Sequence, residues 1–216
     1  LENHDIAANT ENCWDDSMTR VWLSTATSWL GGAGKEGGEE GIAIYIRKGI
    51  ECEELSLKNS HEQVKSVRVT IRDWSRRGSH VIGVYYGPPD QAKPIDEDCC
   101  LQLQEAFWLQ ALFLHGDFNH PDICWKVAQE QSRSLLQCIK NNFLSQVIDG
   151  LTKGDAILDL LLTKANKLTS DIRIGVCLCC SDHAMVELML WRDMRQAKSK
   201  IRIRILGKLP SSSSGS

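Results

Sequence analysis

Apolar segments of strand length are the feature that most constrains how this chain folds. Val67–Ile71 alternates apolar and polar residues with a period of two, as a half-buried strand does. Val81–Tyr86 is almost continuously apolar and is followed by a pair of prolines. Runs of the same kind cover residues 42–46, 111–114, 157–162, 171–178 and 184–190. Because each strand must bury an apolar face, so many strands predict stacked sheets.

Helical periodicity is confined to two segments, residues 97–110 and 130–143. The expected fold class is therefore α/β: a two-sheet α/β sandwich with flanking helices. The glycine-rich stretch 31–41 contains a literal G-x-G-x-x-G at Gly32–Gly37. A dinucleotide site needs a strand before this motif and a helix after it, whereas here a strand follows, so we expect no small-molecule cofactor.

Length, composition and net charge further limit the kinds of protein that this chain can be. The chain has 216 residues, 42% of them hydrophobic, which suits one large domain with or without a tail. Its formal net charge is -3, so a nucleic-acid enzyme of this composition needs a local basic groove. No apolar run approaches the ~20 residues of a membrane-spanning helix, so no membrane partner is expected. Composition leaves the oligomeric state open.

The nine cysteines are odd in number and irregularly spaced within apolar runs. This pattern predicts reduced thiols in an intracellular protein. The cluster at 177–180 lacks the second spaced pair that a structural zinc site usually has, so neither a disulfide nor a zinc site is expected.

The chain changes character near its end. We expect a domain over residues 1–193, and a basic linker with a Ser-rich disordered tail over 194–216. The lysines and arginines after Leu190 are interpreted as a solvated linker, with a phosphate-contacting arm as the alternative.

Polar residues that follow apolar strands carry the chemistry. Asp117 and Asn119 come at the end of the run Leu112–His115, after Gly116, which permits a sharp turn. A carboxylate and an amide two residues apart could hold a water and a phosphate oxygen, although an ordinary Asx turn has the same pattern.

Three further segments fit the same scheme. Asp182 and His183 precede an apolar strand and supply a metal ligand beside a proton acceptor. Asp159 lies inside an apolar strand, where an unpaired carboxylate is costly, so we predict a hydrogen bond from His183 to Asp159. Glu11 ends a strand-like segment and is a candidate ligand for a hard cation.

In this order, Glu11, Tyr86, Gly116–Asn119, Asp159 and Asp182–His183 resemble the endonuclease/exonuclease/phosphatase superfamily, which is DNase I-like. The segments Gly83–Asp90 and Gly116–Trp125 resemble the endonuclease domain of LINE-type, non-LTR retrotransposons. The similarity extends from about residue 1 to residue 200 and is weakest between 18 and 40.

The resemblance implies a hydrolase that nicks DNA in the nucleus and leaves a 3′-hydroxyl for reverse transcription. Glu11 and Asp182 would bind the cation, which is magnesium, or manganese in its place. Asn119 and Tyr86 would hold the phosphate, and Asp117 would activate the water or protonate the leaving oxygen. His183, oriented by Asp159, would act as a base or stabilise the transition state.

Two departures from the family pattern bear on activity. The strand with the family's metal-proximal asparagine would lie upstream of Leu1, and Tyr86–Pro89 lacks the arginine that the family carries there. Without that strand we expect an open sheet edge near Glu11 and weak nicking or none. A catalytically dead relic of a transposon, or a phosphatase of the same superfamily, remains an alternative.

Overall fold

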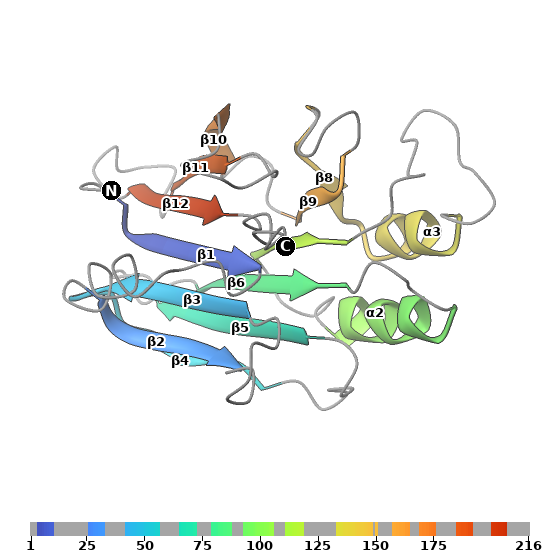
Figure 1. Ribbon diagram of the computed structural model, residues 1–216, viewed down its shortest axis with the longest axis horizontal. Helices are drawn as coiled ribbons and strands as arrows, with labels where there is room; N and C mark the ends of the chain where they lie inside the picture. The colour runs from blue at the N-terminus through green and yellow to red at the C-terminus, as the bar shows by residue number, and fades with distance from the viewer. Residues whose placement is uncertain are drawn as a thin grey trace, which may run out of the picture.

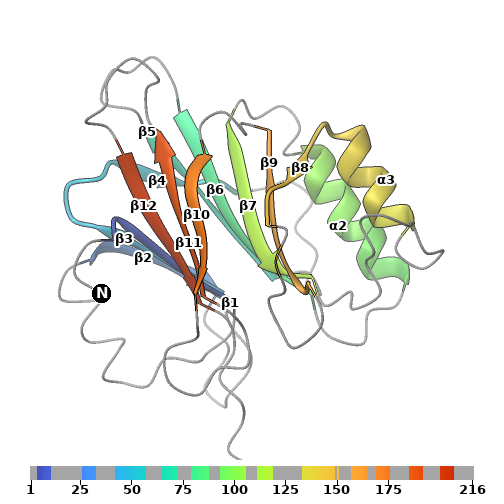
Figure 2. The same ribbon diagram turned by 90° about the horizontal axis from the view of Figure 1, so that it is seen from above.

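Two six-stranded sheets lie face to face, and two helices cover the outer face of one of them (Figures 1 and 2). The computed structural model describes residues 4–10, 26–32, 42–56, 65–72, 79–87, 93–105, 111–118, 133–148, 150, 157–164, 169–175, 185–191 and 200–206. Within these ranges the fold is the two-sheet α/β sandwich with flanking helices that the strand pattern predicts.

Sheet A has the strand order β10 (Thr169–Gly175), β11 (Met185–Trp191), β12 (Lys200–Leu206), β1 (Ile6–Thr10), β3 (Ile42–Arg47), β2 (Ala26–Gly32). Sheet B has the order β4 (Cys52–Glu54), β5 (Lys65–Arg72), β6 (Ser79–Tyr86), β7 (Leu112–Asp117), β9 (Asp159–Thr163), β8 (Ser145–Gln146). The helices are α2 (Lys93–Glu105) and α3 (Arg133–Asn141), and both pack on sheet B.

Alternation along the strands divides the apolar residues between two cores. The core between the sheets includes Ile6 and Ile44 from sheet A and Val84 and Phe113 from sheet B. The core between sheet B and the helices takes the intervening residues, such as Leu114. Because sheet B is covered on both faces, β6 and β7 are buried along nearly their whole length, which explains why their sequences are continuously apolar.

Strand β12 corrects two expectations. Residues 200–206, which we had assigned to a basic linker, form a strand that pairs antiparallel with β11 and parallel with β1. Isoleucines alternate with the basic residues, and Ile203 is buried between the sheets. The alternation of isoleucines with lysine and arginine has the period of two that is typical of a strand, and this alternation is stronger evidence than the positive charge that suggested a linker. As a result, β1 has a hydrogen-bonded neighbour on each side, and the open edge that we expected beside it is absent.

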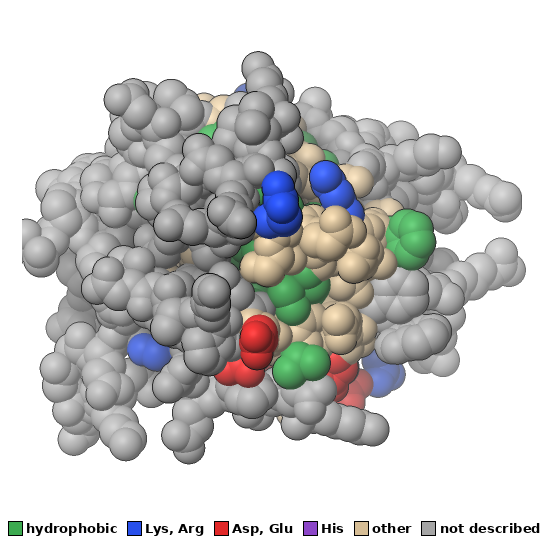
Figure 3. All heavy atoms as spheres, turned by 90° about the vertical axis from the view of Figure 1, so that its right-hand side faces the viewer, with side chains coloured by type: hydrophobic (Ala, Val, Ile, Leu, Met, Phe, Trp, Pro, Cys, Tyr) green, Lys and Arg blue, Asp and Glu red, His purple; other side chains and the backbone are tan. Residues whose placement is uncertain are grey.

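The helices lie close to the predicted segments. Helix α3 buries Leu135, Leu136, Cys138 and Ile139, the face that its periodicity indicates. It ends at Asn141, and Phe143, in the turn that follows, adopts a positive φ of 52° and leaves its side chain 76% exposed. On the face of the molecule that Figure 3 shows, which is the right-hand side of Figure 1, the described hydrophobic side chains form separate spots, with no continuous patch among them.

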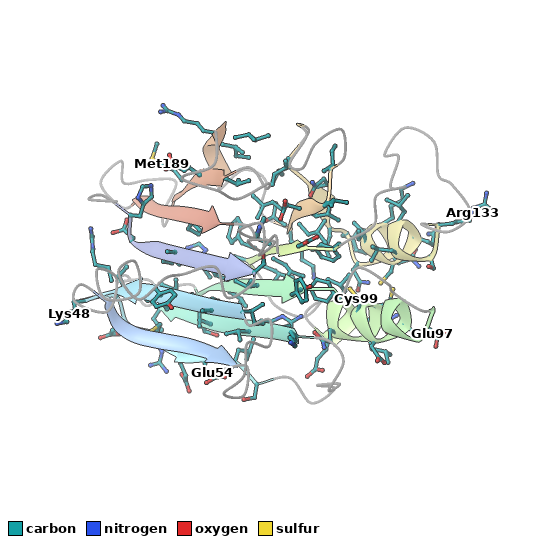
Figure 4. All side chains as sticks on the ribbon, in the orientation of Figure 1. Lys48, Glu54, Glu97, Cys99, Arg133 and Met189 are labelled. Carbon is teal, nitrogen blue, oxygen red and sulfur yellow. The ribbon has the colours of Figure 1, made fainter. Side chains whose placement is uncertain are left out.

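The described cysteines are free thiols: Cys52, Cys99, Cys100 and Cys138. Cys99 lies on the sheet-facing side of α2, whereas the exposed Glu97 and Arg133 point away from the sheets (Figure 4). The other five cysteines are outside the described residues. Neither described helix is long and apolar enough to cross a membrane.

Candidate active site

Strand directions bring the candidate motifs toward one edge of the sandwich. Strands β1 and β6 point the same way, and β7 is parallel to β6, so all three reach this edge with their carboxyl ends (Figures 1 and 2). Strands β9 and β11 run in the opposite direction and begin there. We call this edge the strand-end rim. It holds Thr10, Tyr86, Asp117, Asp159 and Met185 as strand-terminal residues.

Three predicted site residues are neighbours on sheet B at this rim. Tyr86 and Asp117 are register partners across the parallel pair β6–β7. Asp117 and Asp159 are register partners across the antiparallel pair β7–β9. All three side chains therefore lie on the face of sheet B that is directed toward sheet A, and each is no more than 3% exposed.

The hydrogen-bond pattern makes Asp117 and Asp159 a close pair. The amide of Phe118 donates to the carbonyl of Leu158 at 3.0 Å, and the amide of Lys164 donates to that of Leu112 at 3.4 Å. Hydrogen-bonded and non-hydrogen-bonded positions alternate in an antiparallel ladder, so Asp117 and Asp159 occupy a non-hydrogen-bonded position. At such positions the Cα atoms are about 4.5 Å apart and the side chains approach closely. Two carboxylates thus face each other in a buried setting.

Gly116 matters for a reason different from the predicted turn. It lies inside β7, and a Cβ atom built on it would overlap the carbonyl oxygen of Tyr85 on β6. The same atom would come within 2.8 Å of the carbonyl carbon and the Cβ of Tyr85. The missing side chain therefore lets the two parallel strands approach closely at the residue before Asp117.

Contacts on both sides of the rim hold Asp117 in place. The amide of Gly87 donates to the carbonyl of Asp117 at 2.9 Å. On the helix-facing side, the rings of Phe118 and Tyr85 stack with centroids 4.5 Å apart. Tyr85 thus packs under the helices while the adjacent Tyr86 faces the rim.

A buried cation anchors the other face of sheet B. Arg68 of β5 is 2% exposed, and its guanidinium donates to Gln102 Oε1 of α2 at 3.3 Å and to Ser66 Oγ at 3.4 Å. Burial lowers the pKa of Arg68 to about 10, which the nearby Cys99 and Glu105 partly oppose. Arg68 faces the helices and so belongs to the support of the sheet, away from the rim.

The other predicted site residues lie outside the described part of the chain: Glu11, Asn119, Asp182 and His183. The predicted hydrogen bond from His183 to Asp159 therefore stays a prediction. In sequence, Glu11 directly follows β1, Asn119 comes two residues after β7, and His183 comes two residues before β11. Each thus adjoins a strand end that reaches the rim.

One described side chain at this site was not predicted. His115 lies two residues before Asp117 on the same face of β7, and its Nε2 is 3.9 Å from Asp159 Oδ1. Both side chains are almost fully buried. The sequence shows His115 within an apolar strand, and a histidine two residues before an aspartate in such a strand is the signal that could have identified it.

The carboxylates suit a hard cation. Facing carboxylates in a buried setting repel each other, and their oxygen atoms are the donors that magnesium prefers. Among the described residues, no group of three His, Cys, Asp or Glu side chains is arranged to hold a metal ion. A complete ligand set would therefore need residues beyond the described ones, such as Glu11 and Asp182.

A family model described as endonuclease-reverse transcriptase matches residues 79–187. These residues include Tyr86, Asp117, Asp159 and the Asp182–His183 pair. A search of curated protein sequences found no match.

Solved structures share the fold at low sequence identity. The endonuclease domain of TRAS1, a telomere-specific non-LTR retrotransposon, superposes with a TM-score of 0.65 at 14% identity, covering 89% of this chain and 99% of that one. The 3′-5′ exonuclease NExo from Neisseria meningitidis has a TM-score of 0.57 at 16% identity, with coverages of 86% and 89%. TDP2 from D. rerio, in complex with a single-stranded DNA product, has a TM-score of 0.54 at 11% identity, covering 83% of each chain.

Proposed function

Since this chain belongs to the endonuclease-reverse transcriptase family of the endonuclease/exonuclease/phosphatase superfamily, we propose that it nicks DNA in a magnesium-dependent reaction. The nick would leave a 3′-hydroxyl that a reverse transcriptase extends. The observation that carries the proposal is the meeting of Tyr86, Asp117 and Asp159 on neighbouring strands at the strand-end rim. The family description supports both the endonuclease and its link to reverse transcription.

In this proposal each described residue has a separate task. The Tyr86 hydroxyl donates a hydrogen bond to a phosphate oxygen. The Asp117 carboxylate orients the attacking water and accepts its proton, or Asp117 in its carboxylic acid form donates its proton to the leaving 3′ oxygen. Asp159 accepts a hydrogen bond from the His183 ring and fixes its tautomer, so that His183 faces the scissile phosphate. Asn119 donates to the same phosphate.

The cation would be held by Glu11 and Asp182, with magnesium replaceable by manganese. When bound, it would neutralise charge that develops on the phosphate oxygens. The facing carboxylates Asp117 and Asp159 suit such a site, because a nearby cation offsets their mutual repulsion. Because the buried carboxylates of the rim repel the DNA phosphates, the proposal also requires Asn119 or basic residues near the rim to bind the DNA.

The paired edge of β1 changes our expectation about activity. We had expected weak nicking partly because the sheet edge near Glu11 would be open, and that reason no longer holds. We therefore propose an active nuclease rather than a relic.

The test is conversion of supercoiled plasmid to nicked circles by the purified chain, with magnesium and with EDTA. Asp117→Asn should lower the rate at least ~100-fold, as loss of a positioned catalytic group does. Glu97→Gln removes one negative charge from the exposed side of α2 and should keep the full rate. A DNA polymerase should extend the nicks directly if they carry 3′-hydroxyls.

Two results would overturn the proposal. One is a wild-type chain that leaves the plasmid supercoiled, or an Asp117→Asn variant that nicks the plasmid as fast as the wild-type chain does. The other is magnesium-dependent release of phosphate from p-nitrophenyl phosphate without any plasmid nicking, which would favour the phosphatase alternative.

A further inference from the structure

His115 is a buried polar residue with apolar neighbours on the adjacent strands. Its register partners are Val84 on β6 and Leu161 on β9, and neither is more than 1% exposed. Along its own strand it stands between Phe113 and Asp117 on the face toward sheet A. The described core residues of sheet A that face this surface are apolar apart from Thr10.

A polar neighbour of His115 lies toward the rim. His115 Nε2 is 3.9 Å from Asp159 Oδ1, and the two residues are diagonal neighbours across the β7–β9 pair. This distance exceeds that of a direct hydrogen bond, but it is within the range in which a polarised or charged ring attracts a carboxylate. Buried polar groups take polar partners, and the Nε2 atom of this ring lies toward the Asp159 carboxylate.

We propose that His115 is a positioning residue that holds the Asp159 carboxylate in place from the interior of the sandwich. Asp159 faces Asp117 at a close cross-strand position, where repulsion between like charges pushes the two side chains apart. Attraction from His115 Nε2 to Asp159 Oδ1 opposes this displacement. The inference rests on the proposed function, in which Asp159 orients the His183 ring.

Enzyme kinetics of two variants separates positioning from general structural support. His115→Leu keeps the volume of a buried side chain and removes the polar nitrogen. His115→Gln places an amide nitrogen near the position of Nε2. We expect His115→Leu to lower kcat about 10-fold with KM changed less than about twofold, because loss of a supporting partner acts on the chemical step. His115→Gln should recover most of that loss.

A matched control is available on the same face of the same sheet. His80 of β6 is also buried, and its ring lies against Phe113 at a centroid distance of 6.2 Å. It stands four residues further from the rim than Val84, the partner of His115, which is about 13 Å along a strand. His80→Leu should change stability without changing kcat or KM.

A second measurement tests the contact without any need for activity. Urea unfolding midpoints of His115→Leu, Asp159→Asn and the double variant form a cycle. If the two side chains interact, the shift of the double variant will differ from the sum of the single shifts. A parallel cycle with His80→Leu and Asp159→Asn should be additive, since those residues are well separated.

The outcomes are distinct. A wild-type chain that nicks no DNA overturns the proposed function. Additive midpoints for His115→Leu and Asp159→Asn overturn the inference, whatever the activity. The inference is also overturned if His115→Gln is as slow as His115→Leu, or if His80→Leu loses as much kcat.

Discussion

Gly116→Ala tests whether the close approach of β6 and β7 sets the position of Asp117. An alanine Cβ would overlap the carbonyl oxygen of Tyr85, and backbone on both sides limits how far either strand can move. Overpacking of a core commonly costs 1–3 kcal/mol, and a clash with backbone belongs at the upper end, about 3 kcal/mol. For a chain of this size each kcal/mol corresponds to about 2–4 °C, so the melting temperature should fall by about 6–12 °C.

The same change should slow the reaction. Relief of the clash moves β7 against β6 next to Asp117, and a misplacement of about 1 Å can cost about 10²-fold in rate. Differential scanning calorimetry gives the melting temperature, and plasmid nicking at a temperature where both chains are folded gives the rate.

Gly83→Ala is the matched control one strand away. Its Cβ would come within 2.8 Å of Leu114 Cδ1 and 3.0 Å of Arg68 Cγ, which are atoms of flexible side chains. It should cost about 1 kcal/mol and leave nicking unchanged. The reasoning is refuted if Gly116→Ala melts within about 2 °C of Gly83→Ala and nicks at the wild-type rate.

Three further predictions concern stability. Phe143→Gly should raise the free energy of unfolding, measured in urea, by about 1 kcal/mol, because glycine adopts the left-handed backbone without strain and little packing is lost with a mostly exposed side chain. A free energy of unfolding that falls by about 1 kcal/mol would contradict this. Arg68→Met should change that free energy by no more than about 1 kcal/mol or raise it, whereas Gln102→Leu removes one acceptor of the buried guanidinium and should cost about 3 kcal/mol. The reverse order would show that the cation itself stabilises the fold. A chain of residues 1–191 lacks β12 and should associate by light scattering, while residues 1–207 should remain monodisperse at the same concentration; equal behaviour would mean that β12 does not protect β1.

Much of the fold follows from local patterns. Val67–Ile71 and Leu112–His115 are strands because their side chains suit a half-buried and a fully buried sheet, respectively. The helical periodicity of Leu135, Leu136 and Ile139 likewise predicts the face that α3 buries. These signals depend on near neighbours in the sequence, so one sequence is enough to read them.

The arrangement within the site depends on distant partners and was harder to predict. Sequence order suggested His183 as the neighbour of Asp159, which stays a prediction, and gave no sign that Asp117 and His115 on β7 are its neighbours in sheet B. The local sequence pattern of a strand does not determine which strands become its neighbours in a sheet. The same limit applies to β12, whose pairing with β1 joins residues at opposite ends of the sequence.

The parallel pairing of β1 with β12 affects the order in which the chain can fold. Ile6 is matched with Ile203, so sheet A is completed by contacts of very high sequence separation. Such contacts form slowly, because a long loop must close before they are made. During synthesis, β1 can pair with β3 early, but its other side must wait until residues 200–206 have left the ribosome. In contrast, β5, β6 and β7 follow one another in the chain and can assemble beforehand, so the half of the rim with Tyr86 and Asp117 should form before the half beside Glu11.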